Sequence, residues 1–374
     1  MLNIDHNSFS ASTVHLDYIT TALSCLMPFG PKDDVLVFID KDGLSFTRQS
    51  NHINRIQLFL SKELFITYLF NHDDNFMRLS LKLSHLLNSV SVSSRQQLDD
   101  ILECTFSYRG HGTPFMLIFQ DSYTTEQVEY STYLTTDADG PNQGLELDRS
   151  SIQLECIIQG DVLYTALKEL REIGCKECYL YAKTDEYTKT KVFSFISKSK
   201  LGFSKIRLPS NRSIMEKLEV YNSTSTIIGF FDFNSIDKLR PSTKIASKVL
   251  LRLDAHGILS ANILCQIDKI AITSSASTSE APADYPGVVI EICMLEKEII
   301  DSASKNEIEV LMRSSIKERT IDSYFTTTMA DPTTKENVAL FEVPTTNRET
   351  NNEERNDKQH ADIIEEDESV PMFF

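Results

Sequence analysis

Three sets of residues in this chain have types and spacings that could support chemistry. Cys175 and Cys178 have the C-x-x-C spacing of a zinc or redox site, but no second pair with this spacing follows. One such pair alone is weak evidence for a metal site. It falls between a predicted helix end and a predicted strand, where buried structural cysteines are the more frequent outcome. We therefore predict no metal, cofactor or catalytic residue here.

The second set consists of adjacent aspartates, at Asp33-Asp34, Asp73-Asp74 and Asp99-Asp100. A two-metal nuclease needs carboxylates that converge on ions about 4 Å apart. All three pairs fall in predicted turns, with no strand that carries an Asp-x-Glu motif. The chain also lacks a phosphate-binding loop of the GxxxxGK[ST] type. Enzymatic hydrolysis is therefore the less favoured interpretation.

The third set is cationic and begins the stretch 238–267. A basic amphipathic helix is predicted first, and the apolar spacing then changes to alternation around a His256-Gly257 turn, which is typical of a helix that leads into a β-hairpin. The chain has a formal net charge of −17, so cations retained on one helix indicate an anionic partner for that face. The alternative is an ordinary solvated helix surface. The cations are Lys238, Arg240, Lys244 and Lys248.

Length and composition limit the class of protein. A chain of 374 residues predicts about two domains and an additional segment, and 41% hydrophobic residues are enough for sizeable cores. No run of about 18 apolar residues is present, so we expect no membrane span. The N-terminus lacks the form of a secretion signal. Seven scattered cysteines favour a reducing compartment.

The elements that would position these residues occur in two similar series. The first half is predicted as a strand at 8–12, a helix at 16–27 with only Asp17 charged, then strands, a helix at 84–91 and more strands. A polar segment at 135–148 forms a linker. The second half restarts with a strand at 152–158 and a helix at 162–173, followed by strands, the basic helix and a last strand at 288–294. Such halves, each an antiparallel sheet with two helices on one face, are an α+β architecture.

This organisation predicts a first domain at 1–134, the linker, a second domain at 149–296 and a tail at 297–374. Open sheet edges must be blunted or paired with a partner, which favours an oligomer. The tail contains 9 basic and 18 acidic residues. After a short helix at 307–312 it has no periodic apolar pattern, so we predict disorder.

Two stretches carry a family resemblance. YRGHGTPFML at 108–117 and KLRPSTK at 238–244 resemble the Rad-one/Rec-one family, a subunit of the nine-one-one DNA-damage checkpoint clamp. The resemblance covers nearly all of residues 1–296. It implies a PCNA-like sliding-clamp fold, with two domains per subunit, helices lining the hole of a heterotrimeric ring, and sheets outside.

The resemblance also implies function and partners. It predicts a nuclear clamp subunit that assembles with two other clamp subunits, is loaded by a replication-factor-C-like loader on double-stranded DNA with recessed ends, and activates checkpoint signalling. Because this family has been linked to 3′-to-5′ exonuclease activity, a repair exonuclease is the alternative. A ring holds DNA topologically, so its lining needs only mild attraction to phosphates.

Within this resemblance, the DNA-facing candidates lie on or just after the second-domain helices: Lys168, Arg171, Lys238, Arg240, Lys244 and Lys248. Glu169 and Glu172 flank Arg171 and weaken its case. The first-domain helices depart from the family pattern, because they carry no lysine and offer only His85 besides Asp17. We therefore expect the second domain to make most of the DNA contacts.

Two edge strands and two tail motifs complete the prediction. By similarity, strands at 126–134 and 203–208 would pair head to tail with different neighbours, although either could be an ordinary internal strand. The interface candidates are Glu126, Val128, Tyr130, Phe203, Lys205 and Arg207. Two tail segments resemble PCNA-interacting peptides, with anchors at Ile321, Tyr324, Phe325, Val370, Phe373 and Phe374. Exposed aromatic anchors of this kind suit a groove, for example on PCNA, but short matches also arise by chance.

Overall fold

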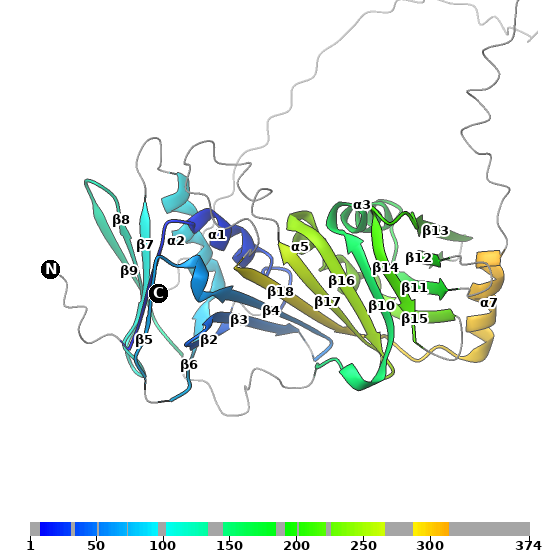
Figure 1. The fold of residues 1–374 in the computed structure, drawn as a ribbon, viewed down its shortest axis with the longest axis horizontal. Coiled ribbons are helices and arrows are strands. Elements are labelled where there is room, and N and C mark those ends of the chain that lie inside the picture. Colours follow the sequence, from blue (N-terminus) through cyan, green and yellow to red (C-terminus); the bar gives the residue numbers. More distant parts are fainter. Residues whose placement is uncertain are drawn as a thin grey trace, which may run out of the picture. The chain divides into compact units, whose positions relative to one another are not determined.

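The computed structural model describes residues 8–30, 34–50, 52–72, 74–95, 102–133, 145–184, 191–199, 202–221, 226–265 and 287–313. These belong to a compact unit that extends to Ser314. The predicted antiparallel α+β architecture is confirmed, and every strand pairing in this unit is antiparallel. Figure 1 follows the chain through its two series of strands and helices.

The first half contains nine strands and two helices among its described residues. In chain order they are β1 (Phe9–Thr13), α1 (Leu16–Ser24), β2 (Asp34–Asp40), β3 (Gly43–Ser50), β4 (Asn54–Ser61), the 3₁₀ turn η2 (Lys62–Leu64), β5 (Thr67–Phe70), β6 (Phe76–Lys82), α2 (Leu83–Arg95), β7 (Glu103–Tyr108), β8 (Phe115–Gln120) and β9 (Thr125–Tyr130).

The second half repeats this order and ends in one extra helix. It runs through η3 (Arg149–Ser151), β10 (Ile152–Gln159), α3 (Gly160–Glu172), β11 (Glu177–Thr184), β12 (Lys191–Ser199), β13 (Gly202–Leu208), β14 (Met215–Val220), β15 (Thr226–Asp232), α4 (Phe233–Asp237), α5 (Arg240–Ile245), β16 (Ala246–Asp254), β17 (Ile258–Cys265), β18 (Val288–Leu295) and α7 (Ser302–Arg313).

The two halves also pair their strands in the same way. β1 pairs with β5 and β7, and β10 pairs with β14 and β16; likewise β2 pairs with β3 and β6, and β11 with β12 and β15. The three sheets have the orders β5-β1-β7-β8-β9, β14-β10-β16-β17-β18-β4-β3-β2-β6 and β13-β12-β11-β15. The duplication predicted from the order of elements is therefore also a duplication of topology.

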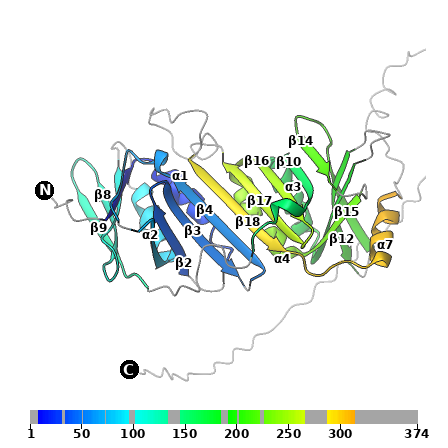
Figure 2. The same ribbon diagram turned by 60° about the horizontal axis from the view of Figure 1, so that its bottom comes forward.

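The helices α1, α2, α3 and α5 cover one face of the nine-stranded sheet, whose opposite face comes forward in Figure 2. Their apolar residues join the inward side chains of the strands in one main core, which includes Phe9, Phe46 and Phe106 of the first half and Phe193 and Phe231 of the second. Below, the outer side of a strand means the side that points away from this core.

The end of α1 differs from the predicted helix at 16–27. The helix closes at Ser24, and turns follow at 25–28. The buried Arg48 of β3 donates from Nη1 to the carbonyls of Leu26 (2.9 Å) and Met27 (3.3 Å) and from Nη2 to that of Gly30 (3.4 Å). Carbonyls at a helix end lack partners within the helix, and a guanidinium satisfies them well. Arg48 therefore fixes where the chain leaves α1.

The helix α7 belongs to the compact unit, although the sequence suggested only a short helix at 307–312 inside the tail. Its buried Ile308 packs with Leu311 and Met312 on the outer side of the four-stranded sheet, against Tyr179, Tyr181, Ile196 and Phe230. The predicted tail therefore begins too early at residue 297, because residues as far as 313 pack on the second half. The predicted linker is described only from residue 145 onwards.

Candidate nucleic-acid and subunit interfaces

The predicted basic helix at 238–248 is two short helices and the start of a strand. α4 ends at Asp237, Lys238 and Leu239 form the junction, and Pro241 lies in the first turn of α5, where a missing N–H costs nothing. α5 packs on α3. A side chain at Gly160, the first residue of α3, would collide with the backbone and side chain of Ala246, so a glycine is needed for this close approach.

Two of the six cations predicted to contact DNA share one carboxylate. Arg171 of α3 places Nη1 3.1 Å from Oδ2 of Asp237, and Arg240 places Nε 2.8 Å from Oδ1 of the same residue. The hydrogen bond to Asp237 raises the pKa of Arg240 above its ordinary value. Lys168 lies 3.7 Å from Glu172 one turn along α3. These pairs reduce the net positive charge that the helix surface presents.

Two other predicted cations are not on the helix surface. Lys248 lies in β16, where its Nζ is 2.6 Å from Oε1 of Glu216 on β14, so its prediction as a helix residue is wrong. Lys238 is half-buried, with its Nζ 5.6 Å from the ring centre of Phe29 in the first half. Burial lowers the pKa of Lys238. This lysine packs between the two halves.

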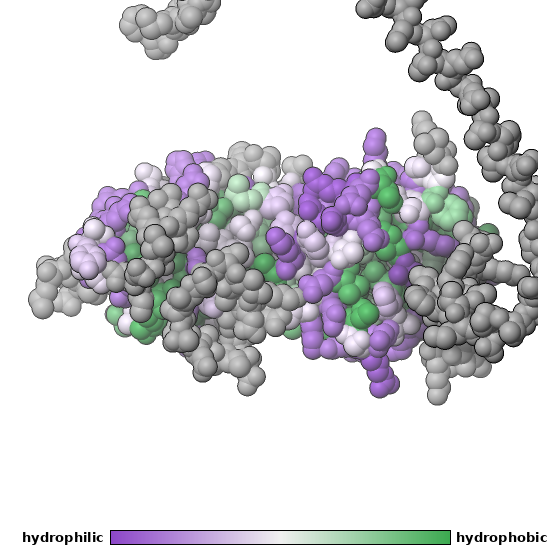
Figure 3. Space-filling model, turned by 90° about the horizontal axis from the view of Figure 1, so that it is seen from above, coloured by the Kyte–Doolittle hydropathy of each residue, from purple (hydrophilic) through white to green (hydrophobic). Residues whose placement is uncertain are grey.

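Lys244 of α5 is the member of the set that is exposed and makes no ion pair with any residue that the structure describes. Figure 3 looks onto the helix-bearing face and shows hydrophilic residues gathered over α3 and α5. The helix α1 contributes Asp17, and α2 contributes His85 and, as its last residue, Arg95, which lies beyond the helix predicted at 84–91. Most of the positive groups on these helices thus belong to the second half, where Lys168, Arg171 and Arg240 are paired.

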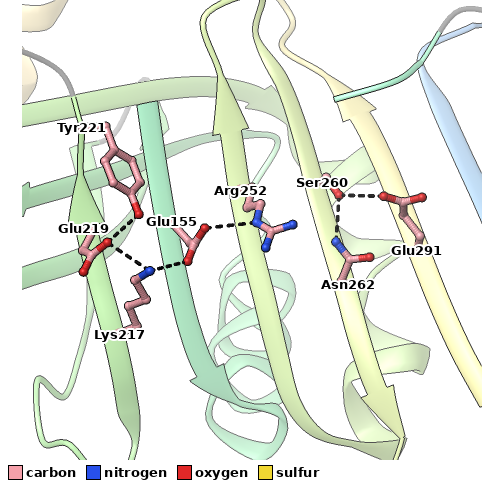
Figure 4. A network of polar contacts seen from close by, with 8 residues as sticks. All are labelled: Glu155, Lys217, Glu219, Tyr221, Arg252, Ser260, Asn262 and Glu291. Carbon is pink, nitrogen blue, oxygen red and sulfur yellow. Dashed lines mark hydrogen bonds and ion pairs between the residues drawn. The ribbon is translucent and has the colours of Figure 1, made fainter. Parts of the chain in front are cut away.

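The opposite face of the nine-stranded sheet carries polar contacts between carboxylates, cations and neutral side chains, drawn in Figure 4. Glu155 of β10 accepts from Lys217 (2.7 Å) and from Arg252 (3.2 Å), and Lys217 also lies 3.0 Å from Glu219. The hydrogen bond from Lys217 lowers the pKa of Glu155. A separate group lies on β17 and β18, where Ser260 donates to Glu291 (3.2 Å) and accepts from Asn262 (3.3 Å). The three carboxylates of these two groups are matched by three cations, because Arg55 pairs with Glu291, so the face offers phosphates no net attraction here.

Both predicted interface strands lie at sheet edges in the described part of the chain. β9 pairs only with β8 at one end of the five-stranded sheet, and β13 pairs only with β12 at one end of the four-stranded sheet. Each therefore has a free row of backbone donors and acceptors that could extend into another chain. The alternative interpretation, in which either strand is internal to its sheet, is therefore wrong.

The chosen interface residues point in different directions. Val128 and Tyr130 of β9 pack toward the main core, whereas Phe203, Lys205 and Arg207 of β13 lie on the outer side. The outer side of β9 instead carries Gln127 and Glu129, which the sequence-based selection missed. Alternation along the strand, counted from the buried Tyr130, would have indicated these two residues.

The chain itself contains one edge-to-edge joint, between the two halves. β18 pairs with β4 over seven residue pairs, from Val288 opposite Leu60 to Met294 opposite Asn54. On the outer side of this joint, Arg55 of β4 lies 3.6 Å from Glu291 of β18, and the Arg55 side chain is 5% exposed. By the duplicated topology, β4 corresponds to β13, and β18 corresponds to β9.

The described residues offer little for metal chemistry. They contain no group of three or more His, Cys, Asp or Glu side chains that could hold a metal ion. Cys175 donates to the carbonyl of Glu177 (3.3 Å), and its interaction with Cys178 lowers its own pKa and raises that of Cys178. Asp33, Asp73 and the pair at 99–100 lie outside the described residues.

Three further observations concern the predicted partners. All six proposed docking-peptide anchors, from Ile321 to Phe374, lie outside the described residues. Among the helices that the structure describes, none is long and apolar enough to cross a membrane. The unpaired strand edges, a helix-bearing face with modest positive charge and an opposite face whose carboxylates are paired with cations are the features that any function must use.

The architecture is that of a PCNA-like clamp, as predicted. PCNA from Thermococcus kodakaraensis superimposes with a TM-score of 0.56 at 11% identity, over 77% of this chain and 100% of that chain. PCNA from Entamoeba histolytica gives a TM-score of 0.57 at 12% identity, over 78% and 100%. At such low identity these matches establish the fold alone.

The sequence itself identifies the family. The family model described as repair protein Rad1/Rec1/Rad17 matches residues 8–265, and the chain belongs to this family. It is 53% identical to the DNA damage checkpoint control protein RAD17 of Saccharomyces cerevisiae, over 98% of each chain. A protein of the same description from Eremothecium gossypii is 51% identical over 82% of this chain and 81% of that protein. The predicted family is therefore confirmed.

Proposed function

We propose that this protein is one subunit of a ring-shaped DNA-damage checkpoint clamp, built with two other PCNA-like subunits. Its relatives are named as DNA damage checkpoint control proteins, and its fold is that of PCNA clamps. The subunit acts by encircling double-stranded DNA and presenting surfaces to other proteins, and it needs no catalytic centre. These comparisons do not favour the exonuclease alternative.

One observation carries the proposal: the chain joins its own halves by the pairing that a ring requires between subunits. β18 of the second half pairs with β4 of the first, while the corresponding strands β9 and β13 have free edges. Pairing β9 of one subunit with β13 of the next would repeat the internal joint. Such a head-to-tail contact is heterologous and generates a closed ring when the rotation closes.

The helix-bearing face suits the lining of this ring. Sliding requires weak, sequence-independent attraction, because each strong phosphate contact adds to a barrier and to salt dependence. Lys244 is exposed, while Lys168, Arg171 and Arg240 each have a carboxylate partner that moderates their attraction. Lys238 and Lys248, although predicted as DNA contacts, support the joint and the sheet instead.

The remaining partners follow from this role. A ring must be opened and placed on DNA, so we assign loading to a replication-factor-C-like loader acting at recessed ends, in the nucleus. The tail anchors Ile321, Tyr324, Phe325, Val370, Phe373 and Phe374 are assigned to docking on PCNA or on another clamp subunit. A labelled peptide covering residues 314–374, titrated with PCNA and with each clamp subunit, tests this assignment; no binding at high micromolar concentration would reject it.

Reconstitution tests the function as a whole. The chain is co-purified with the two other clamp subunits, loaded on primed circular DNA and washed at high salt. The proposal expects a heterotrimer that survives the wash on circular DNA and slides off after a restriction enzyme linearises the circle. Equal retention on circular and linear DNA, or failure to form a trimer, would contradict it. Assaying the chain alone with Mn²⁺ on labelled DNA checks for nuclease activity.

A further inference from the structure

We propose that the free edges of β9 and β13 choose different neighbours by opposite charge, an inference that rests on the ring assembly proposed above. The β9 edge would take a subunit whose edge strand carries cations on its outer side. The β13 edge would take a subunit whose edge strand carries carboxylates there. The charge on the edges would thereby fix the order of subunits around the ring.

The β9 edge is acidic. Its sequence, TEQVEY, contains Glu126 and Glu129 and no cation. Glu129 lies opposite Met116 of β8, on the outer side of the strand, and is exposed. The contact that the structure records for its carboxylate is a hydrogen bond of 2.8 Å donated by Gln127. The Glu129 carboxylate is therefore available to a cation on a neighbouring strand.

The β13 edge is basic. Its sequence, GFSKIRL, contains Lys205 and Arg207 and no carboxylate. Arg207 is exposed on the outer side and makes no ion pair with the residues that the structure describes. Lys205 donates from Nζ to the carbonyl of Leu311, at the C-terminal end of α7, over 3.0 Å. This contact holds α7 beside the edge, so a neighbour at β13 would also meet this helix end.

The β4–β18 joint within the chain has the same arrangement of charges, with a cation on one strand and a carboxylate on the other. β4, the counterpart of β13, supplies the cation Arg55, and β18, the counterpart of β9, supplies the carboxylate Glu291. Both lie on the outer side of their strands, as Arg207 and Glu129 do. The external joints would therefore repeat both the backbone pairing of the internal joint and its direction of charge.

Charged side chains on paired edge strands mainly determine which partner a strand accepts. Opposite charges across adjacent strands are favourable, and like charges directly opposite are unfavourable. A subunit with a basic edge would be rejected at β13 and accepted at β9. The acidic β9 edge and the basic β13 edge of two copies of this chain would also suit each other, so self-association is the competing outcome of the test. We commit to two different subunits as occupants, as in the ring proposed above.

Charge reversals at the two edges test the inference. Binary binding of the full chain to each of the other two clamp subunits is measured by sedimentation velocity at low and high salt. Glu129→Lys should weaken binding to one subunit by about tenfold and leave the other unchanged, and Arg207→Glu should do the converse. Both losses should diminish at high salt, because screening weakens charge pairs.

Matched controls reverse exposed charges elsewhere: Glu63→Lys in η2 and Lys176→Glu before β11. Both should bind each subunit as the unaltered chain does, and circular dichroism should show unchanged folding for all four variants. If the unaltered chain binds its partners and both edge reversals bind equally well, the charge inference is overturned while the ring remains. If the unaltered chain binds neither subunit, the proposed function itself fails. Self-association that both reversals abolish would overturn the commitment to different subunits.

Discussion

At the scale of single residues, some charged groups of this protein hold elements together in ion pairs, and others are exposed to possible binding partners. Asp237 engages two guanidinium groups, Arg171 and Arg240, and so couples α3 to the α4–α5 segment. Exposed pairs of this kind contribute little to stability, about 0–1 kcal/mol each. Their consequence is electrostatic, because the same carboxylate lowers the attraction of both arginines for a phosphate.

One half-buried carboxylate, that of Glu296, should make stability depend on pH. Glu296 follows β18 and borders a cavity of about 290 Å³ between β15, the β16–β17 turn and α7. The charged groups that face it are Lys305 and Glu309 of α7 and Asp254 of β16. Burial raises the pKa of Glu296 from 4.5 to about 7.

The expected result is a loss of stability as pH rises. The folded protein holds this proton more strongly than the unfolded chain, so the stabilisation is fully present below about pH 4.5 and is lost as pH rises through 7. At 1.36 kcal/mol per pKa unit the loss is at most about 3 kcal/mol. The substitution Glu296→Gln should remove this pH-dependent loss of stability. Urea midpoints of both proteins should agree near pH 4 and diverge near pH 8, with the Gln variant the more stable.

Glu298→Gln is the matched control, because Glu298 is exposed two residues further on. Its midpoints should follow those of the unaltered chain at every pH. Parallel pH profiles for the unaltered chain and Glu296→Gln would show that the half-buried carboxylate does not hold its proton as we infer.

At the scale of elements, the periodicity of the sequence predicted most of the fold, since most strands alternate apolar and polar residues and α3 has a clear apolar stripe. β14 was missed because it is a half-exposed edge strand with alternating charge, MEKLEV. The basic helix was predicted too long, because residues 246–254 have a strand register set by pairing with β10 and β17. The site was harder to predict, because ion pairs such as Lys248–Glu216 join residues far apart in sequence.

The helix α7 provides the prediction at this scale. Its Ile308 is 1% exposed against Tyr179, Tyr181 and Phe230, whereas Val310 on the opposite side is 62% exposed. Ile308→Ala should lower the free energy of unfolding by about 2 kcal/mol, because it leaves a cavity in a packed interface. Val310→Ala should change it by less than about 0.5 kcal/mol. Denaturant titration compares the two.

Limited proteolysis extends that test to the helix itself. If α7 is held on the sheet chiefly by Ile308, the substitution should also speed cleavage within residues 302–313. Unchanged midpoints and cleavage in both variants would mean that α7 does not depend on this apolar contact.

At the scale of the whole molecule, the two halves share a topology but differ in charge on their helix-bearing face. The helices of the first half carry Asp17, His85 and one arginine, Arg95 at the end of α2, whereas Lys244 of the second half is exposed and free of ion pairs within the described residues. In a ring, attraction to DNA would therefore come mainly from the second half of this subunit, and topology would supply retention.

Adding one cation to the first half and removing one from the second tests whether the second half supplies the attraction to DNA. Ser24 is exposed at the end of α1, on the side away from the buried Ile19 and Leu23, and a lysine there also suits the helix C-terminus. Ser24→Lys should strengthen DNA binding by the assembled clamp, and Lys244→Ala should weaken it. The slope of log affinity against log salt should steepen or flatten by up to about 0.9 for one phosphate contact. Fluorescence anisotropy with a duplex at several salt concentrations measures both slopes.

The neutral substitution Ser24→Gln separates charge from side-chain length and should leave the slope unchanged. If Lys244→Ala and Ser24→Lys bind with the slope of the unaltered clamp, the helix-bearing face does not meet phosphates. The DNA would then have to contact another surface. That result would contradict the ring orientation itself, whatever the order of its subunits, because the orientation places α3 and α5 against the DNA.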